Sequence, residues 1–183
     1  TMAEESPRPS ALRMLAWGCL WSPLADDDEH RETWEVLGLP GCFEDVRIDY
    51  WNCFHAGMPQ PPVPLLIHGL LRQEGAGVRE DLMRVADYLE VECGERRLPP
   101  DHLGPVCELY GLAIAREEPV LIEGLRERYL KPWAETALPA LADRPAMAML
   151  VAPAVTPAVR YARIDADRAT FLEWRAMVDA PLG

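Results

Sequence analysis

The sequence contains one compact group of residues with evident chemistry, the run LPPDHL from Leu98 to Leu103. Its two prolines fix the backbone where a helix is expected to begin, and they place Asp101 and His102 side by side in the first turn. A carboxylate held rigidly in this way can take a guanidinium group through charge-assisted hydrogen bonds. Alternatively, Asp101 caps the helix and complements its dipole. Both interpretations are open at this point.

The Asp-His pair is poorly equipped for catalysis, because the sequence lacks the usual partner groups. All serines lie within the first 22 positions, and neither a Gly-x-Ser-x-Gly nor a Ser-x-x-Lys pattern occurs. The single lysine, Lys131, is followed by Pro132, so that no phosphate-binding Lys-Ser/Thr pair exists. The four histidines lack the spacing of a helical metal site. We therefore expect a protein that is not an enzyme and that uses neither a cofactor nor a metal.

The composition also limits the partners and the compartment. The formal net charge of −12 at pH 7 repels nucleic acids and anionic membranes, and it favours either solubility or a cationic partner. Residues 11–21 are apolar but too short to span a bilayer, so stable membrane insertion is not expected. Five widely spaced cysteines without a Cys-x-x-Cys pattern indicate a reducing compartment. These features predict a cytoplasmic protein.

Apolar residues recur at helical spacing through most of the 183 residues, and alternating strand patterns are nearly absent. The length suits one domain, so we expect a single-domain, all-α bundle over residues 1–183. Helices are expected at about 11–21, 26–37, 43–55, 65–71, 78–89 and 103–114, from 119 to Pro132, which ends or kinks that helix, at 133–141 and at 167–178. Between them we expect an extended loop at 57–64, a turn at 74–77, and an irregular Pro/Ala-rich segment at 145–165, with flexible residues at 1–9.

The sequence is rich in tryptophan, with six in 183 residues. Most are expected in the core, where large aromatic side chains bury the most apolar surface. Trp51 is the exception, because it stands beside Tyr50 and just before the proline-rich loop. It is the best candidate for the wall of a binding groove.

The order of these motifs resembles that of one known family. An aromatic segment from Tyr50 to Phe54 (YWNCF) precedes a Pro/Gly-rich loop, an amphipathic helix and the LPPDHL run, which Glu108 follows. This order is similar to that of the TorD/DmsD/NarJ family, cytoplasmic chaperones that mature molybdenum oxidoreductases. The loop sequence FHAGMPQPPVPL looks most like the branch that serves type II enzymes of the dimethyl sulfoxide reductase family. The resemblance covers roughly residues 45–135.

The chain departs from the family pattern in three places. Cys53 stands where the family has a leucine before the phenylalanine. An arginine, Arg96 or Arg97, stands where an acidic residue often precedes the Leu-Pro pair. Pro100 stands between Pro99 and Asp101, at a position that varies in the family pattern. It is expected to stiffen the turn formed by Leu98–Leu103, which we call the corner.

The resemblance implies an all-α, non-catalytic chaperone that binds the twin-arginine signal peptide, the apo catalytic subunit of a molybdoenzyme, or both, as a monomer or a homodimer. It would assist cofactor insertion and delay export. The implied binding residues are Tyr50, Trp51 and Phe54 in the groove, Pro100, Asp101 and His102 at the corner, and Glu108 for a second charge. Phe54 is equally compatible with the core. On this reading, Asp101→Asn weakens peptide binding and leaves thermal stability nearly unchanged.

Two alternatives belong to other classes of protein. In the first, Asp101 and His102 lie in a cleft of an all-α enzyme or small-ligand binder, which turnover or a co-purifying ligand would reveal. In the second, the chain is an adaptor that joins folded subunits through residues 145–159, and deletion of that segment would abolish partner binding.

Overall fold

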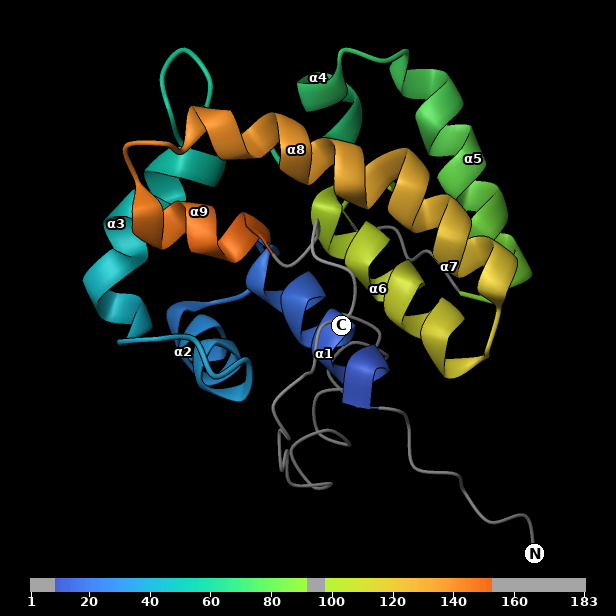
Figure 1. The fold of residues 1–183 in the computed structure, drawn as a ribbon, viewed down its shortest axis with the longest axis horizontal. Helices are drawn as coiled ribbons and strands as arrows, with labels where there is room; N and C mark the ends of the chain where they lie inside the picture. Colours follow the sequence, from blue (N-terminus) through green and yellow to red (C-terminus); the bar gives the residue numbers. More distant parts are fainter. Residues whose placement is uncertain (1–8, 92–97, 153–183) are drawn as a thin grey trace, which may run out of the picture.

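The structure is a computed structural model that describes residues 9–91 and 98–152, and in these ranges it is all-α (Figure 1). The elements are α1 (Pro9–Leu20), α2 (Asp27–Val36), α3 (Phe43–Phe54), α4 (Ile67–Leu71), α5 (Gly75–Tyr88), α6 (Leu103–Ala115), α7 (Pro119–Leu125), the π-helical turn η1 (Arg126–Leu130), α8 (Lys131–Ala140) and α9 (Pro145–Val151). The all-α prediction is confirmed. The predictions for residues 1–8, for 153–165 and for a helix at 167–178 lie outside the described residues.

Two helix starts follow from acidic capping residues. Asp26 caps α2 through a hydrogen bond from the Glu29 amide, and the Glu29 carboxylate accepts from the Asp26 amide in return, which is a capping box. The Glu74 carboxylate caps α5 by accepting from the amides of Ala76 and Gly77. The predicted turn at 74–77 is therefore wrong, because these residues form the cap and the first turn of α5.

One long continuous helix crosses the bundle, and it consists of α7, η1 and α8 in succession (Figure 1). The backbone stays helical at Leu125, Leu130 and Lys131, where the three elements join. Pro132 lies in the first turn of α8, directly after the π-helical turn, so the wider turn accommodates the residue that lacks an amide hydrogen. Pro132 thus neither ends nor breaks the helical path.

The irregular structure expected from residue 145 is also wrong for its first part. Pro145–Val151 form α9, with the proline in the first helical turn, where its missing amide hydrogen is harmless. Met147, Leu150 and Val151 are buried, and α9 packs against α3 and α8. Tertiary packing therefore makes a helix of a segment whose proline content suggested a loop.

The closest helix pair is α1 and α6, which run antiparallel through the middle of the bundle (Figure 1). Glycines permit this approach: a Cβ added at Gly18 would lie 3.0 Å from the Gly104 carbonyl oxygen, and one at Gly111 would lie 3.0 Å from the Ala11 carbonyl oxygen. Both contacts are with the backbone of the facing helix, which cannot rotate away as a side chain can. The pair therefore depends on residues without a side chain.

Gly111→Ala is expected to destabilise the fold by about 1–3 kcal/mol, because the added methyl group overpacks the α1–α6 contact. Gly124→Ala is the matched control, since Gly124 lies in α7 and a Cβ there would meet nothing within 4 Å. That variant is expected to gain up to about 1 kcal/mol from alanine's higher helix propensity. Chemical denaturation measures both changes, and equal effects of the two substitutions would contradict the close packing of α1 and α6.

Candidate functional site

The corner before α6 is built by pairing two segments that are distant in the sequence. The Ile67 amide donates to the Asp101 carbonyl oxygen at 2.9 Å, and the Leu103 amide donates to the Leu65 carbonyl oxygen at 2.8 Å. These bonds form an isolated antiparallel bridge between Leu66 and His102. The bridge fixes the start of α6 against the start of α4, so the backbone of the corner is rigid.

The Asp101 carboxylate, two residues before α6, bonds to side chains of α4 and α5. One oxygen accepts a hydrogen bond from Nδ1 of His68 in α4, and the other accepts from Nε of Arg79 in α5 at 2.8 Å. Asp101 is fully buried, whereas the side chains of His68 and Arg79 are 25% and 42% exposed. The buried carboxylate therefore joins α4, α5 and the start of α6, and its two partners are closer to the surface than it is.

The environment of Asp101 favours its ionised form. Burial by itself raises the pKa of the Asp101 carboxyl. Hydrogen bonds and charges from His68 and Arg79 outweigh burial and hold this pKa below its ordinary value. The carboxylate is thus a fixed negative charge that already binds a guanidinium group.

His102, and not Asp101, is the capping residue of α6. Its Nδ1 accepts a hydrogen bond from the Gly104 amide at 3.1 Å, which requires that this nitrogen be unprotonated. Burial lowers the pKa of His102 to about 4, with the Asp101 charge acting weakly in the opposite direction. A side chain of the corner does cap the helix, as the capping interpretation predicted. The capping residue is His102, and the prediction of Asp101 was wrong.

Most of the aromatic segment lies in the core. Tyr50 is completely buried, and its hydroxyl donates to the Leu20 carbonyl oxygen. Phe54 is 2% exposed and meets the Trp21 ring edge-on, with centroids 5.0 Å apart. Trp51 alone of the three predicted groove residues is partly exposed. Phe54 is therefore a core residue, and of the three predicted groove residues only Trp51 offers an aromatic surface.

A hydrogen-bonded pair links the buried Tyr50 to the half-buried His55. His55 Nε2 lies 3.1 Å from the Tyr50 hydroxyl, and its ring centroid is 4.5 Å from that of Trp51. Burial, together with the charges that His102 and His30 can carry, lowers the pKa of His55 to about 3. Burial also lowers the pKa of His30, whose Nε2 is buried without a hydrogen-bond partner. Burial therefore favours the neutral form of His30 and His55.

The remaining predicted residues lie apart from the Asp101 carboxylate. Pro100 is half-buried in the turn that leads to α6. Glu108 is half-buried and faces α1, where its Cγ would lie 2.8 Å from a Cβ added at Gly18. Asp101 faces α4 and α5 instead, so the structure does not bring the two carboxylates together around one ligand.

Sequence reasoning missed His68 and Arg79 as partners of Asp101. They stand 33 and 22 residues before it in the chain, and no spacing motif links them. The sequence contains only a weak indication of the Arg79 contact. Arg79 follows the apolar Val78 in an amphipathic helix, which places it near the border of the buried face but names no partner. Only the folding of α4 and α5 against the start of α6 places the three side chains together.

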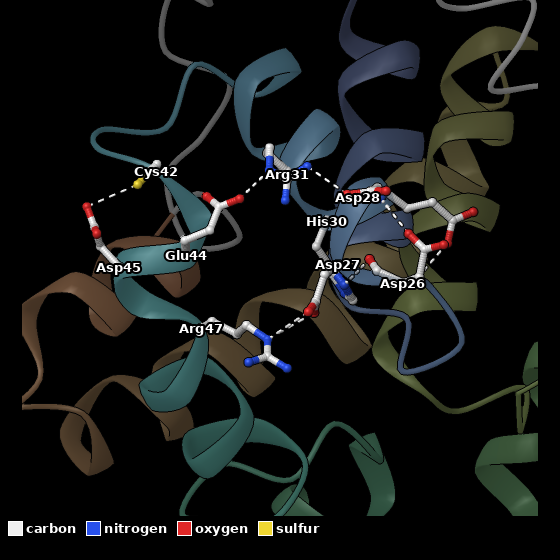
Figure 2. A network of polar contacts seen from close by, with 10 residues as sticks. Asp26, Asp27, Asp28, His30, Arg31, Cys42, Glu44, Asp45 and Arg47 are labelled. Carbon is white, nitrogen blue, oxygen red and sulfur yellow. Dashed lines mark hydrogen bonds and ion pairs between the residues drawn. The ribbon is translucent and has the colours of Figure 1, made fainter.

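Within residues 9–91 and 98–152, acidic side chains gather on α2, α3 and the cap of α2. Their exposed side includes Asp26, Asp27, Asp28, Glu32, Glu35, Glu44, Asp45 and Asp49. Figure 2 shows two arginines among them: Arg31 binds Glu44 and Asp28, and Arg47 reaches back to Asp27 at 3.0 Å. These exposed ion pairs add little stability. Acidic residues outnumber the basic ones here, which leaves a strongly negative face.

Metal-binding side chains, hydroxyls and thiols are further groups of the described residues that could carry chemistry. In residues 9–91 and 98–152, no group of three or more His, Cys, Asp or Glu side chains is placed to hold a metal ion. The Thr33 and Thr136 hydroxyls donate to carbonyl oxygens of their own helices. Burial raises the pKa of the Cys53 and Cys107 thiols, which disfavours the reactive thiolate.

Among the residues that the structure describes, no helix is both long and apolar enough to cross a membrane.

Comparisons with protein-family models, with curated protein sequences and with solved structures find no match to this chain.

Proposed function

We propose that this chain is a cytoplasmic chaperone for a molybdenum oxidoreductase: it binds the twin-arginine signal peptide, the apo catalytic subunit, or both, assists cofactor insertion and delays export. The observation that carries the proposal is the Asp101 carboxylate, held on a rigid corner and hydrogen-bonded to a guanidinium group. The order of motifs that resembles the TorD/DmsD/NarJ family supports it. The twin-arginine motif supplies the same chemical group that the corner already accepts.

The charge distribution supports a cationic client. The acidic face of α2 and α3 would attract a positively charged peptide over a distance and increase the rate of encounter. The apolar part of a signal peptide needs a surface of its own, and the partly exposed Trp51 ring beside His55 is the best candidate. Affinity would then come from apolar contact, and selectivity from the guanidinium site.

The test is a titration of the full chain with a fluorescently labelled twin-arginine signal peptide, followed by fluorescence anisotropy. The matched peptide replaces both arginines with lysine, which keeps the charge but removes the planar donor group. We expect the twin-arginine peptide to bind at least about tenfold more tightly, a difference of about 1.4 kcal/mol. Equal affinities, or no binding of either peptide, would contradict the proposal.

One observation favours a second candidate, a small-ligand binder or an enzyme. A buried carboxylate that orients an imidazole through Nδ1, as Asp101 does for His68, is also the arrangement of a general base. A small molecule that co-purifies with the chain, or a turnover that His68→Gln abolishes, would favour this candidate over the chaperone.

A further inference from the structure

The two hydrogen bonds of the Asp101 carboxylate differ in how firmly they are held. His68 is packed closely: a Cβ added at Gly75 would lie 3.0 Å from its ring, so the backbone at the start of α5 lies directly against the imidazole. Arg79 is less confined, because its long side chain is 42% exposed and reaches the carboxylate through Nε. The His68 bond is therefore the fixed one, and the Arg79 bond is the one that can exchange.

Arg79 also holds one oxygen of the carboxylate. Asp101 is fully buried although both of its partners are partly exposed, so a second guanidinium group can take the place of the Arg79 Nε on this oxygen only if Arg79 moves. Within the described part of the chain, the Asp101 bond is the only hydrogen bond of the Arg79 side chain, and it leaves the two terminal guanidinium nitrogens unused. Arg79 thus occupies the position that a client's arginine would need.

We infer that Arg79 is a built-in competitor, which holds the Asp101 carboxylate in the free protein and is displaced by an arginine of the client. This inference rests on the proposed function and adds the regulation of its binding site. The exchange replaces one guanidinium with another, so the buried carboxylate keeps a cationic partner throughout. That matters because a buried charge left without a partner is strongly unfavourable.

The competition has two consequences for recognition. Because some binding free energy is spent in displacing Arg79, the apparent affinity for the client is lower than the intrinsic affinity of the open site. A peptide that offers lysine, or only apolar residues, lacks a planar guanidinium group to replace that of Arg79 on the Asp101 carboxylate. Arg79 therefore also raises the selectivity of the site for peptides that contain arginine.

The test compares two arginines on the same helix. Arg79→Gln removes the competitor, and Arg84→Gln is the matched control, since Arg84 is exposed and pairs with Glu80 one turn away. We expect Arg79→Gln to lower the Kd for the twin-arginine peptide about tenfold and Arg84→Gln to leave it within about twofold. If the wild type binds and Arg79→Gln binds equally or more weakly, the inference is overturned while the proposed function stands. If neither the wild type nor any variant binds, the proposed function fails.

A second measurement does not depend on the folding of the Gln variant. Proton–nitrogen NMR of the wild type detects the Nε–H group of Arg79, which is assigned by its loss in Arg79→Lys. In the free protein we expect this signal to be protected from exchange with solvent by the bond to Asp101. On saturation with the twin-arginine peptide it should shift and lose that protection. An unchanged signal in the saturated complex would overturn the inference.

Discussion

Lowering the pH from 7.5 to 5 is expected to reduce the free energy of unfolding by about 4 kcal/mol through His55 and His102 alone. Burial lowers the pKa of these side chains to about 3 and about 4, whereas in the unfolded chain both regain the ordinary value of about 6.5. Below pH 6.5 the unfolded state therefore binds protons that the folded state does not. The stability that these two groups contribute is greatest above this value and falls as the pH is lowered toward 4.

The measurement is urea denaturation at several pH values, with His102→Asn as the diagnostic variant. Asparagine is a good helix cap, so it can replace the imidazole as acceptor for the Gly104 amide without titrating. We expect the variant to lose about 2 kcal/mol less than the wild type between pH 7.5 and 5. Carboxyl groups titrate mainly below this range, near pH 4. The same pH dependence in the variant and the wild type would show that His102 is not held neutral.

Asp101→Ala is expected to destabilise the fold by about 3 kcal/mol, because it removes two charge-assisted hydrogen bonds that join α4, α5 and α6. For a chain of this length the melting temperature should fall by about 10 °C. The matched control is Asp27→Ala, which breaks an Asp–Arg pair whose side chains are about half exposed, and it should cost less than about 1 kcal/mol.

This expectation differs from the one drawn from the sequence, in which Asp101→Asn leaves thermal stability nearly unchanged. The earlier expectation assumed an aspartate that faces a groove. Because the carboxylate is buried between His68 and Arg79, Asp101→Asn should lower the melting temperature, although less than alanine does, since the amide keeps an acceptor for Arg79. Equal melting temperatures for Asp101→Ala and Asp27→Ala would contradict the role of Asp101 in joining the helices.

Helical periodicity was sufficient to predict most of the fold. The helices from Phe43 and Leu103 begin where the apolar pattern and the prolines placed them, because local spacing and tertiary burial agree there. The failures occur where these two disagree. The glycines of the 74–77 segment suggested a turn, yet Glu74 caps a helix over them, and the prolines after residue 145 concealed α9.

The candidate site was only partly predictable for a physical reason. The LPPDHL run identified a rigid corner correctly, because proline restricts its own backbone whatever the tertiary context. It could not show which of two adjacent side chains caps the helix and which turns away from it. That choice depends on His68 and Arg79, which contact Asp101 only after α4 and α5 have packed.

The aromatic segment shows the same limit. Periodicity placed Tyr50 and Phe54 on one helical face, but it could not distinguish a face that lines a groove from one that is buried. The Trp21 ring, which lies within 6.4 Å of both rings by centroid, completes a core around them. Sequence reasoning therefore overestimated the aromatic surface that this segment exposes.

The titration of the full chain with the twin-arginine peptide and its twin-lysine counterpart tests the central claim most directly. If the chain recognises guanidinium groups at the Asp101 corner, the twin-arginine peptide will bind at least about tenfold more tightly at equal peptide charge. That preference should persist when added salt weakens both affinities, since salt screens the acidic face of α2 and α3 more than the buried carboxylate. Equal affinities at every salt concentration would mean that only the overall negative charge attracts the peptide, and the proposed site would be wrong.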